Sequence, residues 1–553
     1  MGLTGKRGIV LSALMLTVVA CSEATPTTPT EGVTSDDTSS DSIVGYQPRG
    51  ILSKSLPEIA SAVQAGEVTS AELVQLYMDR IEAVDRSGPT LQSVLTLNPD
   101  AVAQAKALDA KMAAGEIVGP LHGVPVLLKD NIEAKDPMPT TAGALALKDN
   151  MTGRDSPLVK GLRDAGAIIL GKTNLSQWAN FRSVDSMSGW SALGGQVRNP
   201  HMLDRNPCGS SSGSGAAAAA SLAAGTVGTE TNGSIICPSN ASGIVGFKPT
   251  VGVIPQDHII PISATQDTAG PMTKTVMGAA MMMNAMATTT PDVDYTTRLS
   301  PEALKGVRVG VLRFAEGAYH PVIARFNEAL ADIEAAGGIL VEITDRPSVP
   351  DGFGAKAYDL LKYEFKDGLN KYLASTDPAQ VRVRTLADLI AFNLEHADVE
   401  LALFDQSILL SSEEMADVDS ADYKAAVDLV RETTQDNGLD LLLATYDVDV
   451  LVAPSGVVVP RVDPANGDVW PAWPGYGSHA ARAGYPHATV PMGEVTGLSV
   501  GLSFIGGYMT DAAILSYAYA YEQRSQKRLE PRYLKDAEDL PRVAKAMKPY
   551  KPE

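Results

Sequence analysis

Two serines and one lysine form a set that could hydrolyse an acyl bond by nucleophilic attack. Ser210 lies in the run Gly209-Ser-Ser-Ser-Gly-Ser-Gly215, and Ser234 ends a second run, Gly-Thr-Glu-Thr-Asn-Gly-Ser. Lys129 directly follows an apolar stretch. A serine hydroxyl is a weak nucleophile until a base takes its proton, and a lysine amine is a base only when burial lowers its pKa. These residues therefore predict a nucleophile, a hydroxyl relay and a buried amine base.

The segments that must position this set alternate between strand and helix patterns. Helical spacing of apolar residues is found at 69–84, 100–114, 158–165 and 321–336, and apolar runs typical of buried strands at 124–128, 167–170, 307–312, 339–343, 450–453 and 498–505. This alternation predicts an α/β fold, which we expect to be one large domain with a mixed, mostly buried β-sheet surrounded by helices. Residues 354–446 have the composition of a helical insertion over one end of that sheet.

Composition and charge exclude some classes of function. The chain has 553 residues, of which 44% are hydrophobic and 20% are charged, as in globular proteins with a large core. Its formal net charge of -20 argues against a nucleic-acid partner, because phosphates require clustered Lys and Arg. The seven histidines show no metal-binding spacing, so we expect no metal and no cofactor.

The N-terminal segment predicts export. Lys6 and Arg7 precede an apolar stretch that ends in Val-Val-Ala-Cys21, which resembles a bacterial lipobox. We expect residues 1–20 to be a lipoprotein signal peptide, Cys21 to be lipidated, and residues 21–48 to be a disordered tether to a domain spanning 49–553. The chain would then be an exported, membrane-anchored protein facing the periplasm or the cell exterior. The alternative is an ordinary secretory signal in which the cysteine is fortuitous.

Two further patterns point to other chemistries. Residues 166–173 match the phosphate-loop spacing, but the four intervening residues are Ala-Ile-Ile-Leu, which predict a buried strand rather than an open loop. Residues 209–213 match the nucleophile elbow of α/β-hydrolases, with Ser211 as nucleophile and His479 or His487 as a distant base. Turn residues rather than a strand precede this elbow, so it is the weaker alternative.

Several blocks resemble, in the same order, those of the amidase signature family. They are Gly123-Val-Pro-Val-Leu-Leu-Lys-Asp-Asn131, the segment 165–174, the two serine runs, Gly243-Ile-Val-Gly-Phe-Lys-Pro-Thr-Val-Gly252 and Asp267-Thr-Ala-Gly-Pro-Met272. With 452–455 and 501–506, the resemblance covers nearly all of residues 50–530. It implies the fold of that family and a metal-free hydrolysis of carboxamides through an acyl-enzyme.

The resemblance also implies a role for each residue of the set. Ser234 would be the nucleophile, Ser210 the bridging serine that follows a cis peptide bond at Gly209–Ser210, and Lys129 the base. Backbone N–H groups of the nucleophile's turn are expected to bind the oxyanion, from Thr231, Asn232, Gly233 and Ser234. The chain departs from the family at Asn232, where most members carry Gly, and at Ile236, where Arg is common. The first departure leaves the size of the substrate open.

Within the family, the segments 174–182, 188–191 and 228–231 resemble the peptide-amidase branch, which removes C-terminal amides of peptides. Trp178, Phe181 and Trp190 are therefore weaker candidates for lining the substrate site. A broad small-amide or aryl-amide hydrolase remains an alternative, as does an inactive binding lipoprotein on the same scaffold. Cys208 and Cys237 flank the two serines, and either a disulfide or two buried thiols fits the sequence. The sequence leaves the oligomeric state open.

Overall fold

The computed structural model describes residues 44–549. The predicted signal peptide, Cys21 and nearly all of the predicted tether lie outside these residues. Within the described chain, no helix is both long enough and apolar enough to cross a bilayer.

An eleven-stranded mixed sheet organises the chain, with the strand order β1-β3-β2-β6-β8-β7-β12-β13-β11-β9-β10. Parallel pairs hold β3, β2 and β6 together at one end and β11, β9 and β10 at the other, and the pairs between these two groups are antiparallel. A separate short hairpin joins β4 (Trp190–Ser191) to β5 (Gly195–Gln196). The strands of the large sheet are β1 (Val94–Leu97), β2 (Pro125–Lys129), β3 (Ile168–Thr173), β6 (Gly225–Glu230), β7 (Val245–Lys248), β8 (Thr268–Thr273), β9 (Arg308–Leu312), β10 (Ile339–Ile343), β11 (Val450–Pro454), β12 (His487–Val495) and β13 (Leu498–Ile505).

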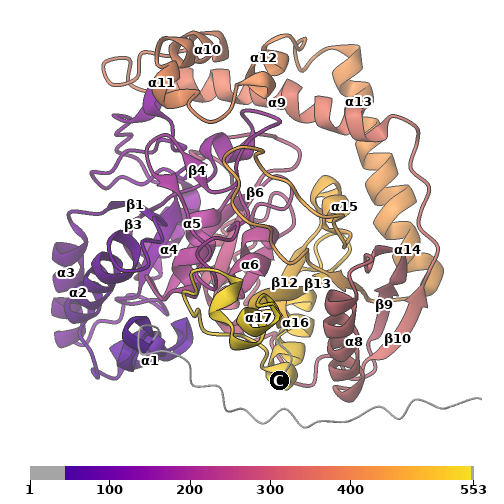
Figure 1. Cartoon of the computed structure of the whole chain (residues 1–553). Helices are drawn as coiled ribbons and strands as arrows, with labels where there is room; N and C mark the ends of the chain where they lie inside the picture. Colours follow the sequence, from indigo (N-terminus) through magenta and orange to yellow (C-terminus); the bar gives the residue numbers. More distant parts are fainter. Residues whose placement is uncertain (1–43, 550–553) are drawn as a thin grey trace, which may run out of the picture. The chain divides into compact units, whose positions relative to one another are not determined.

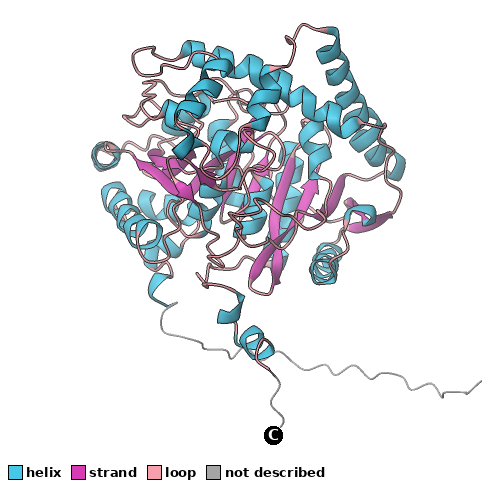
Figure 2. Cartoon of the chain, turned by 45° about the horizontal axis from the view of Figure 1, so that its top comes forward, coloured by secondary structure: helices cyan, strands magenta, loops and turns pink. Residues whose placement is uncertain are grey.

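Helices lie on both sides of the sheet, as Figures 1 and 2 show. The α/β architecture predicted from the sequence is confirmed, with one large mixed sheet flanked by helices. The helices outside the predicted insertion are α1 (Leu56–Gln64), α2 (Ser70–Arg80), α3 (Ala101–Ala113), α4 (Pro157–Asp164), α5 (Ser212–Ala219), α6 (Ile236–Ser242), α7 (Val276–Met286), α8 (His320–Ala335), α15 (Gly477–Ala483), α16 (Asp511–Ser525) and α17 (Pro541–Ala546).

A second set of helices follows β10 and lies at the top and right of Figure 1. Aromatic and aliphatic residues of its longest helix, α9, pack on the segment 178–181 and on Ile260 and Ile262. This set therefore covers one end of the body of the chain. Its members are α9 (Phe353–Ser375), α10 (Leu386–Glu395), α11 (Ala397–Glu400), α12 (Ser407–Glu413), α13 (Ala421–Arg431) and α14 (Asp440–Tyr446).

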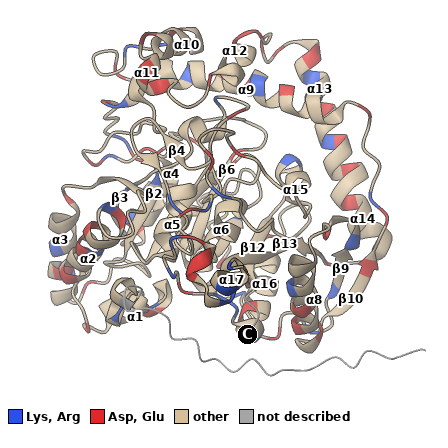
Figure 3. Cartoon of the chain, viewed as in Figure 1, with Lys and Arg blue, Asp and Glu red and all other residues tan. Residues whose placement is uncertain are grey.

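The large sheet lies in the core of the protein. Strands β2, β3, β6, β7, β8, β11 and β13 are buried along their whole length. Charged side chains lie mainly on the outer helices and loops, where both signs are interspersed (Figure 3). A buried lysine or carboxylate is costly in such a core unless it is hydrogen-bonded, so the few that occur there have specific partners or functions.

Candidate active site

Lys129 is the last residue of β2 and is completely buried. Its Nζ donates to Ser210 Oγ at 2.7 Å, to Thr229 Oγ1 at 2.9 Å and to the Thr229 carbonyl at 3.1 Å. Burial lowers the pKa of the Lys129 amine to about 7, while the carboxylates of Asp267 and Glu230 act in the opposite direction. A substantial fraction of the amine is therefore neutral near neutral pH and can accept a proton.

Ser210, the predicted bridging serine, lies in a tightly packed loop. Ser210 is fully buried and follows a cis peptide bond from Gly209. Its carbonyl accepts from the Ser176 N–H at 3.0 Å, and α5 begins two residues later. A Cβ on Gly213 would lie 2.3 Å from the Asn174 carbonyl oxygen, so glycine is required there for α5 to approach this loop.

Ser234 lies in the turn between β6 and α6, with 8% of its surface exposed. The Ser211 N–H donates to the Ser234 carbonyl at 3.1 Å, which holds the two serine loops against each other. Among the described residues, the Ser234 hydroxyl has no hydrogen-bond partner. Such bonds are often long or unformed without substrate and tighten when it binds. The structure therefore joins Lys129, the predicted base, to Ser210, the predicted bridging serine, and bonds the next residue of that loop to Ser234, the predicted nucleophile.

The turn before α6 presents unused backbone donors. Glu230 Oε2 accepts from the N–H groups of Ile235 at 2.7 Å and Ile236 at 3.0 Å, and so caps the first turn of α6. The N–H groups of the four residues expected to bind the oxyanion, Thr231, Asn232, Gly233 and Ser234, donate to no residue of the described chain. Four consecutive free donors next to a serine hydroxyl form an arrangement that can bind an oxyanion.

Other polar side chains support this arrangement. Of these residues only Thr231 was singled out from the sequence, and there for its backbone N–H rather than its side chain. Asn131 Nδ2 donates to Thr229 Oγ1 at 3.0 Å, which orients the hydroxyl that accepts from Lys129. Thr231 Oγ1 donates to Asp267 Oδ1 at 2.5 Å, and burial raises the pKa of Asp267 to about 6. These four residues all lie inside the blocks that carry the family resemblance: Asn131, Thr229, Thr231 and Asp267. The hydrogen bonds between them, however, join positions far apart in the chain.

The departure at Asn232 has a structural counterpart. Asn232 Nδ2 donates to Ser478 Oγ on α15 at 3.1 Å. This bond links the nucleophile's turn to a helix from the C-terminal part of the chain. A glycine at position 232 could not make it.

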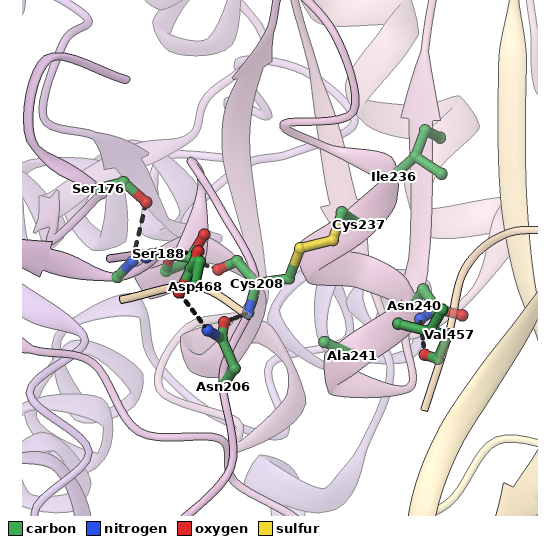
Figure 4. Close-up of a disulfide and its surroundings, with 12 residues drawn as sticks. Ser176, Ser188, Asn206, Cys208, Ile236, Cys237, Asn240, Ala241, Val457 and Asp468 are labelled. Carbon is green, nitrogen blue, oxygen red and sulfur yellow. Dashed lines mark hydrogen bonds between the residues drawn. A yellow bond between two sulfur atoms is a disulfide. The ribbon is translucent and has the colours of Figure 1, made fainter. Parts of the chain in front are cut away.

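Cys208 and Cys237 form a disulfide, with their Cα atoms 5.7 Å apart (Figure 4). Cys208 comes two residues before Ser210, and Cys237 lies in α6, three residues after Ser234. The bond therefore connects the loop that carries Ser210 to the helix that follows Ser234. In the same region Asn206 Nδ2 donates to Asp468 Oδ1 at 2.7 Å, and the Cys208 N–H donates to Asn206 Oδ1 at 2.8 Å.

The three aromatic candidates pack mainly toward the helices that follow β10. Phe181 contacts Tyr358 and Phe365 of α9, and Trp190 lies edge-on to Phe404. Trp178 is 2% exposed within the same apolar cluster, and its indole N–H has no partner among the described residues. Trp178 thus has a buried indole N–H that no residue of the described chain engages.

A buried ion pair ties the segment that carries Trp178 to those helices. The Arg182 guanidinium donates to the Glu400 carbonyl and lies 3.5 Å from Glu400 Oε2, and both side chains have no exposed surface. Gln177 completes the group, because it accepts from Arg182 and donates to Glu400. This group fixes the position of the loop 177–182.

The alternative motifs have structural roles. Residues Ile168–Thr173 form β3, and Lys172 Nζ donates to the Ile132 carbonyl at 2.6 Å, so no phosphate loop is present there. Ser211 Oγ donates to the Thr229 carbonyl at 3.0 Å, and His487 bonds Ser503 at 2.7 Å. Burial lowers the pKa of both His479 and His487 to about 3, and neither contacts Ser211.

Comparison with known proteins agrees with this geometry. The family model Amidase matches residues 72–515. The chain is similar to the solved peptide amidase of Stenotrophomonas maltophilia, with 44% identity, a TM-score of 0.80 and coverage of 86% of this chain and 98% of that one. A peptide amidase in complex with the competitive inhibitor chymostatin gives 44% identity and a TM-score of 0.82, with 86% and 99% covered. A Schizosaccharomyces pombe protein named as an amidase is 33% identical over 548 residues, or 91% of this chain and 88% of that protein.

Proposed function

This chain belongs to the amidase family and is an amide-hydrolysing enzyme, and we propose that it cleaves the C-terminal amides of peptides with a Ser-Ser-Lys triad. The observation that carries the triad is the 2.7 Å bond from the buried Lys129 amine to Ser210, next to the turn that holds Ser234. The substrate class is supported by the 44% identity to peptide amidases over nearly the whole of their length.

In the proposed reaction, Ser234 Oγ attacks the carbonyl carbon of the substrate amide. Its proton moves to Ser210 Oγ, while the proton of Ser210 moves to the neutral Lys129 amine. The negative oxygen of the tetrahedral intermediate accepts from the free N–H groups of the turn, each worth about 3–4 kcal/mol in comparable sites. The proton then returns along the relay to the departing nitrogen, ammonia leaves, and an acyl ester of Ser234 remains.

Water completes the cycle in the second half of the proposed reaction. It attacks the ester carbonyl and gives its proton to the same relay, and the peptide acid leaves as Ser234 regains its hydroxyl. Both halves use one base because Lys129 is neutral again after ammonia departs. The relay therefore needs no additional acid or base.

The direct test is release of ammonia from an N-acetylated dipeptide amide, followed with mass spectrometry of the acid product. We expect the wild-type enzyme to convert the amide and the Ser234→Ala variant to lose at least a thousandfold in kcat. Hydrolysis of aryl or simple amides with none of peptide amides would favour the broad hydrolase. If the protein hydrolyses neither peptide amides nor aryl or simple amides, the result would favour the inactive binding protein.

We also propose that a lipid on Cys21 anchors the enzyme to a membrane outside the cytoplasm, on the evidence of the lipobox-like sequence alone. Expressed in a bacterial host, the full chain should fractionate with membranes and carry the mass of acyl groups. The Cys21→Ala variant should lose both properties. A wild-type chain found only in the soluble fraction would contradict the anchor.

A further inference from the structure

Gln266 is a buried amide side chain with no hydrogen bonds. It has 1% of its surface exposed, and neither its Nε2 nor its Oε1 has a partner within the described chain. A buried amide without partners costs roughly 1–3 kcal/mol by protein mutational data, so evolution rarely leaves one in place without a reason.

Gln266 belongs to a turn that is tied to the nucleophile's turn. The Asp267 N–H donates to the Ser263 carbonyl at 3.0 Å, which closes the turn 263–267 immediately before β8. Thr231 Oγ1, in the turn after β6, donates to Asp267 Oδ1 at 2.5 Å. Gln266 is therefore adjacent in the chain to the carboxylate that bonds the segment carrying the free N–H groups.

Apolar side chains and one buried carboxylate adjoin the turn that carries Gln266. Glu364 Oε2 accepts from the Thr265 N–H at 3.2 Å and from Thr265 Oγ1 at 3.0 Å. The loop before Gln266 carries Ile260 and Ile262, which pack in one apolar cluster with Trp178 and Phe181. The Ile260 N–H donates to the Asn131 carbonyl, two residues beyond Lys129, so this apolar wall adjoins the catalytic strand. The nearest carboxylate in sequence, Asp267, is already engaged by Thr231 and by the N–H groups of Ile262 and Ser263.

We propose that Gln266 is a substrate-binding residue that pairs with the peptide unit preceding the scissile amide. This inference rests on the proposed function and names the part of the substrate that is read. A glutamine amide carries both a donor and an acceptor, as does a peptide unit, so the two groups complement each other with two hydrogen bonds. Such pairing recognises backbone rather than side chains, and it discriminates against amides that lack the adjacent peptide unit because both polar atoms then stay unpaired.

A matched pair of substrates isolates this contact. N-acetylphenylalanine amide and 3-phenylpropanamide share the scissile carboxamide and the benzyl group, and only the first has the neighbouring peptide unit. We expect Gln266→Met to lower kcat/KM for N-acetylphenylalanine amide at least tenfold and to leave 3-phenylpropanamide within twofold. The control Gln256→Met changes a half-buried glutamine of a preceding loop and should change neither value.

Thermal unfolding distinguishes a substrate contact from a structural one. Since Gln266 has no partners in the folded chain, we expect Gln266→Met to keep or raise Tm; a variant that does not fold is replaced by Gln266→Leu. Equal losses on both substrates, or no loss on either, would overturn the proposal, and the second result would indicate a bound water as the partner of the amide.

A binding measurement separates this proposal from the proposed function. In a Ser234→Ala background, calorimetric titration with N-acetylphenylalanine amide should give a Kd at least tenfold weaker when Gln266→Met is added. An unchanged Kd, or no binding in either protein, would overturn the role of Gln266 whatever the activity of the wild type. Failure of the wild type to hydrolyse any peptide amide, with the Kd difference present, would count against the proposed function alone.

Discussion

Lys129 shows how burial gives a lysine side chain the properties of a base. Its amine is surrounded by hydroxyl and carbonyl groups of Ser210 and Thr229. The carboxylates of Asp267 and Glu230 raise the pKa of the amine less than burial lowers it, so the pKa stays at about 7. The neutral amine can accept from Ser210, whereas the charged amine can only donate. The protonation state of one side chain thus decides whether the relay can operate.

The first prediction concerns pH. Because the free enzyme requires neutral Lys129, kcat/KM for a peptide amide should fall about tenfold per pH unit below the pKa of about 7 and level off above it. Initial rates at substrate concentrations far below KM, between pH 5 and 9, measure this profile. A profile that stays flat from pH 5 to 7 would contradict the assignment of the base.

Lys129→Met provides a second readout at the same residue. We expect it to abolish hydrolysis and to raise Tm at pH 8, because the wild-type lysine must lose its proton on folding at any pH between about 7 and its unfolded value of 10.5. The stability of the wild type therefore rises with pH between about pH 7 and pH 10.5. The difference in Tm between Lys129→Met and the wild type should narrow as the pH approaches 10.5. A variant that is less stable than the wild type at pH 8 would show that the amine stabilises the fold.

At the scale of elements, the site depends on the contact between two loops that come from different parts of the chain. One loop follows the β4–β5 hairpin and leads into α5, and the other connects β6 to α6. The backbone bond from Ser211 to Ser234 and the Cys208–Cys237 disulfide join them. The disulfide closes a sequence separation of 29 residues, so it restricts the unfolded chain substantially.

Removing the disulfide should therefore destabilise the enzyme more than it impairs catalysis. For the Cys208→Ser, Cys237→Ser double variant we expect a free energy of unfolding lower by about 2–4 kcal/mol, measured in urea, and less than a tenfold loss in kcat/KM. The wild type treated with a reductant should match the double variant. Unchanged stability in both would show that the loop contacts alone hold the two elements together.

The sequence predicted β2, β3, β9, β10, β11 and β13 from their continuous apolar residues, and it missed β1, β6, β7, β8 and β12 of the large sheet. Two of the missed strands, β6 and β8, contain residues that argue against a strand. The run 124–128 was recognised and corresponds to β2, whereas β6, with the sequence Gly-Thr-Val-Gly-Thr-Glu, has the low strand propensity of glycine. Strand β8 contains Pro271, which also argues against a strand when only the sequence is considered. Strands β6 and β8 pair with each other, and β6 leads into the turn that carries Ser234.

The sequence likewise identified some residues of the site and missed others. Lys129, Ser210 and Ser234 were found because they lie in short blocks of characteristic composition, and the structure then brought Lys129 and Ser210 into contact. Gln266 and Glu400 carry no local signal, because their significance depends on partners, or on the lack of partners, that only the folded chain defines. Long-range pairing of this kind cannot be derived from periodicity or composition.

At the scale of the whole molecule, a buried ion pair connects the helices after β10 to the body of the chain. Arg182 lies in the body and Glu400 ends α11, and both are fully buried with Gln177 between them. A buried charge left without its partner is costly, about 3–5 kcal/mol in known cases. The buried group of Arg182, Gln177 and Glu400 therefore fixes the helices after β10 in one position relative to the body of the chain, near Trp178.

A double-mutant cycle tests that coupling. Arg182→Met should lower the free energy of unfolding by about 3–5 kcal/mol and raise KM for peptide amides, because the loop 177–182 loses its anchor. Adding Glu400→Gln should recover part of the stability, since no unpaired charge remains buried. Additive losses in the double variant would show that the two side chains act independently.

The central claim is that Ser234 becomes acylated with the help of Ser210 and Lys129. The most direct measurement is mass spectrometry of the enzyme quenched with acid during turnover of a peptide amide, followed by peptide mapping. We expect an adduct with the mass of the peptidyl group on the fragment that carries Ser234, strongly reduced in Ser210→Ala and Lys129→Met and absent in Ser234→Ala. An adduct on Ser211, or an adduct that persists at full yield in Lys129→Met, would contradict the account.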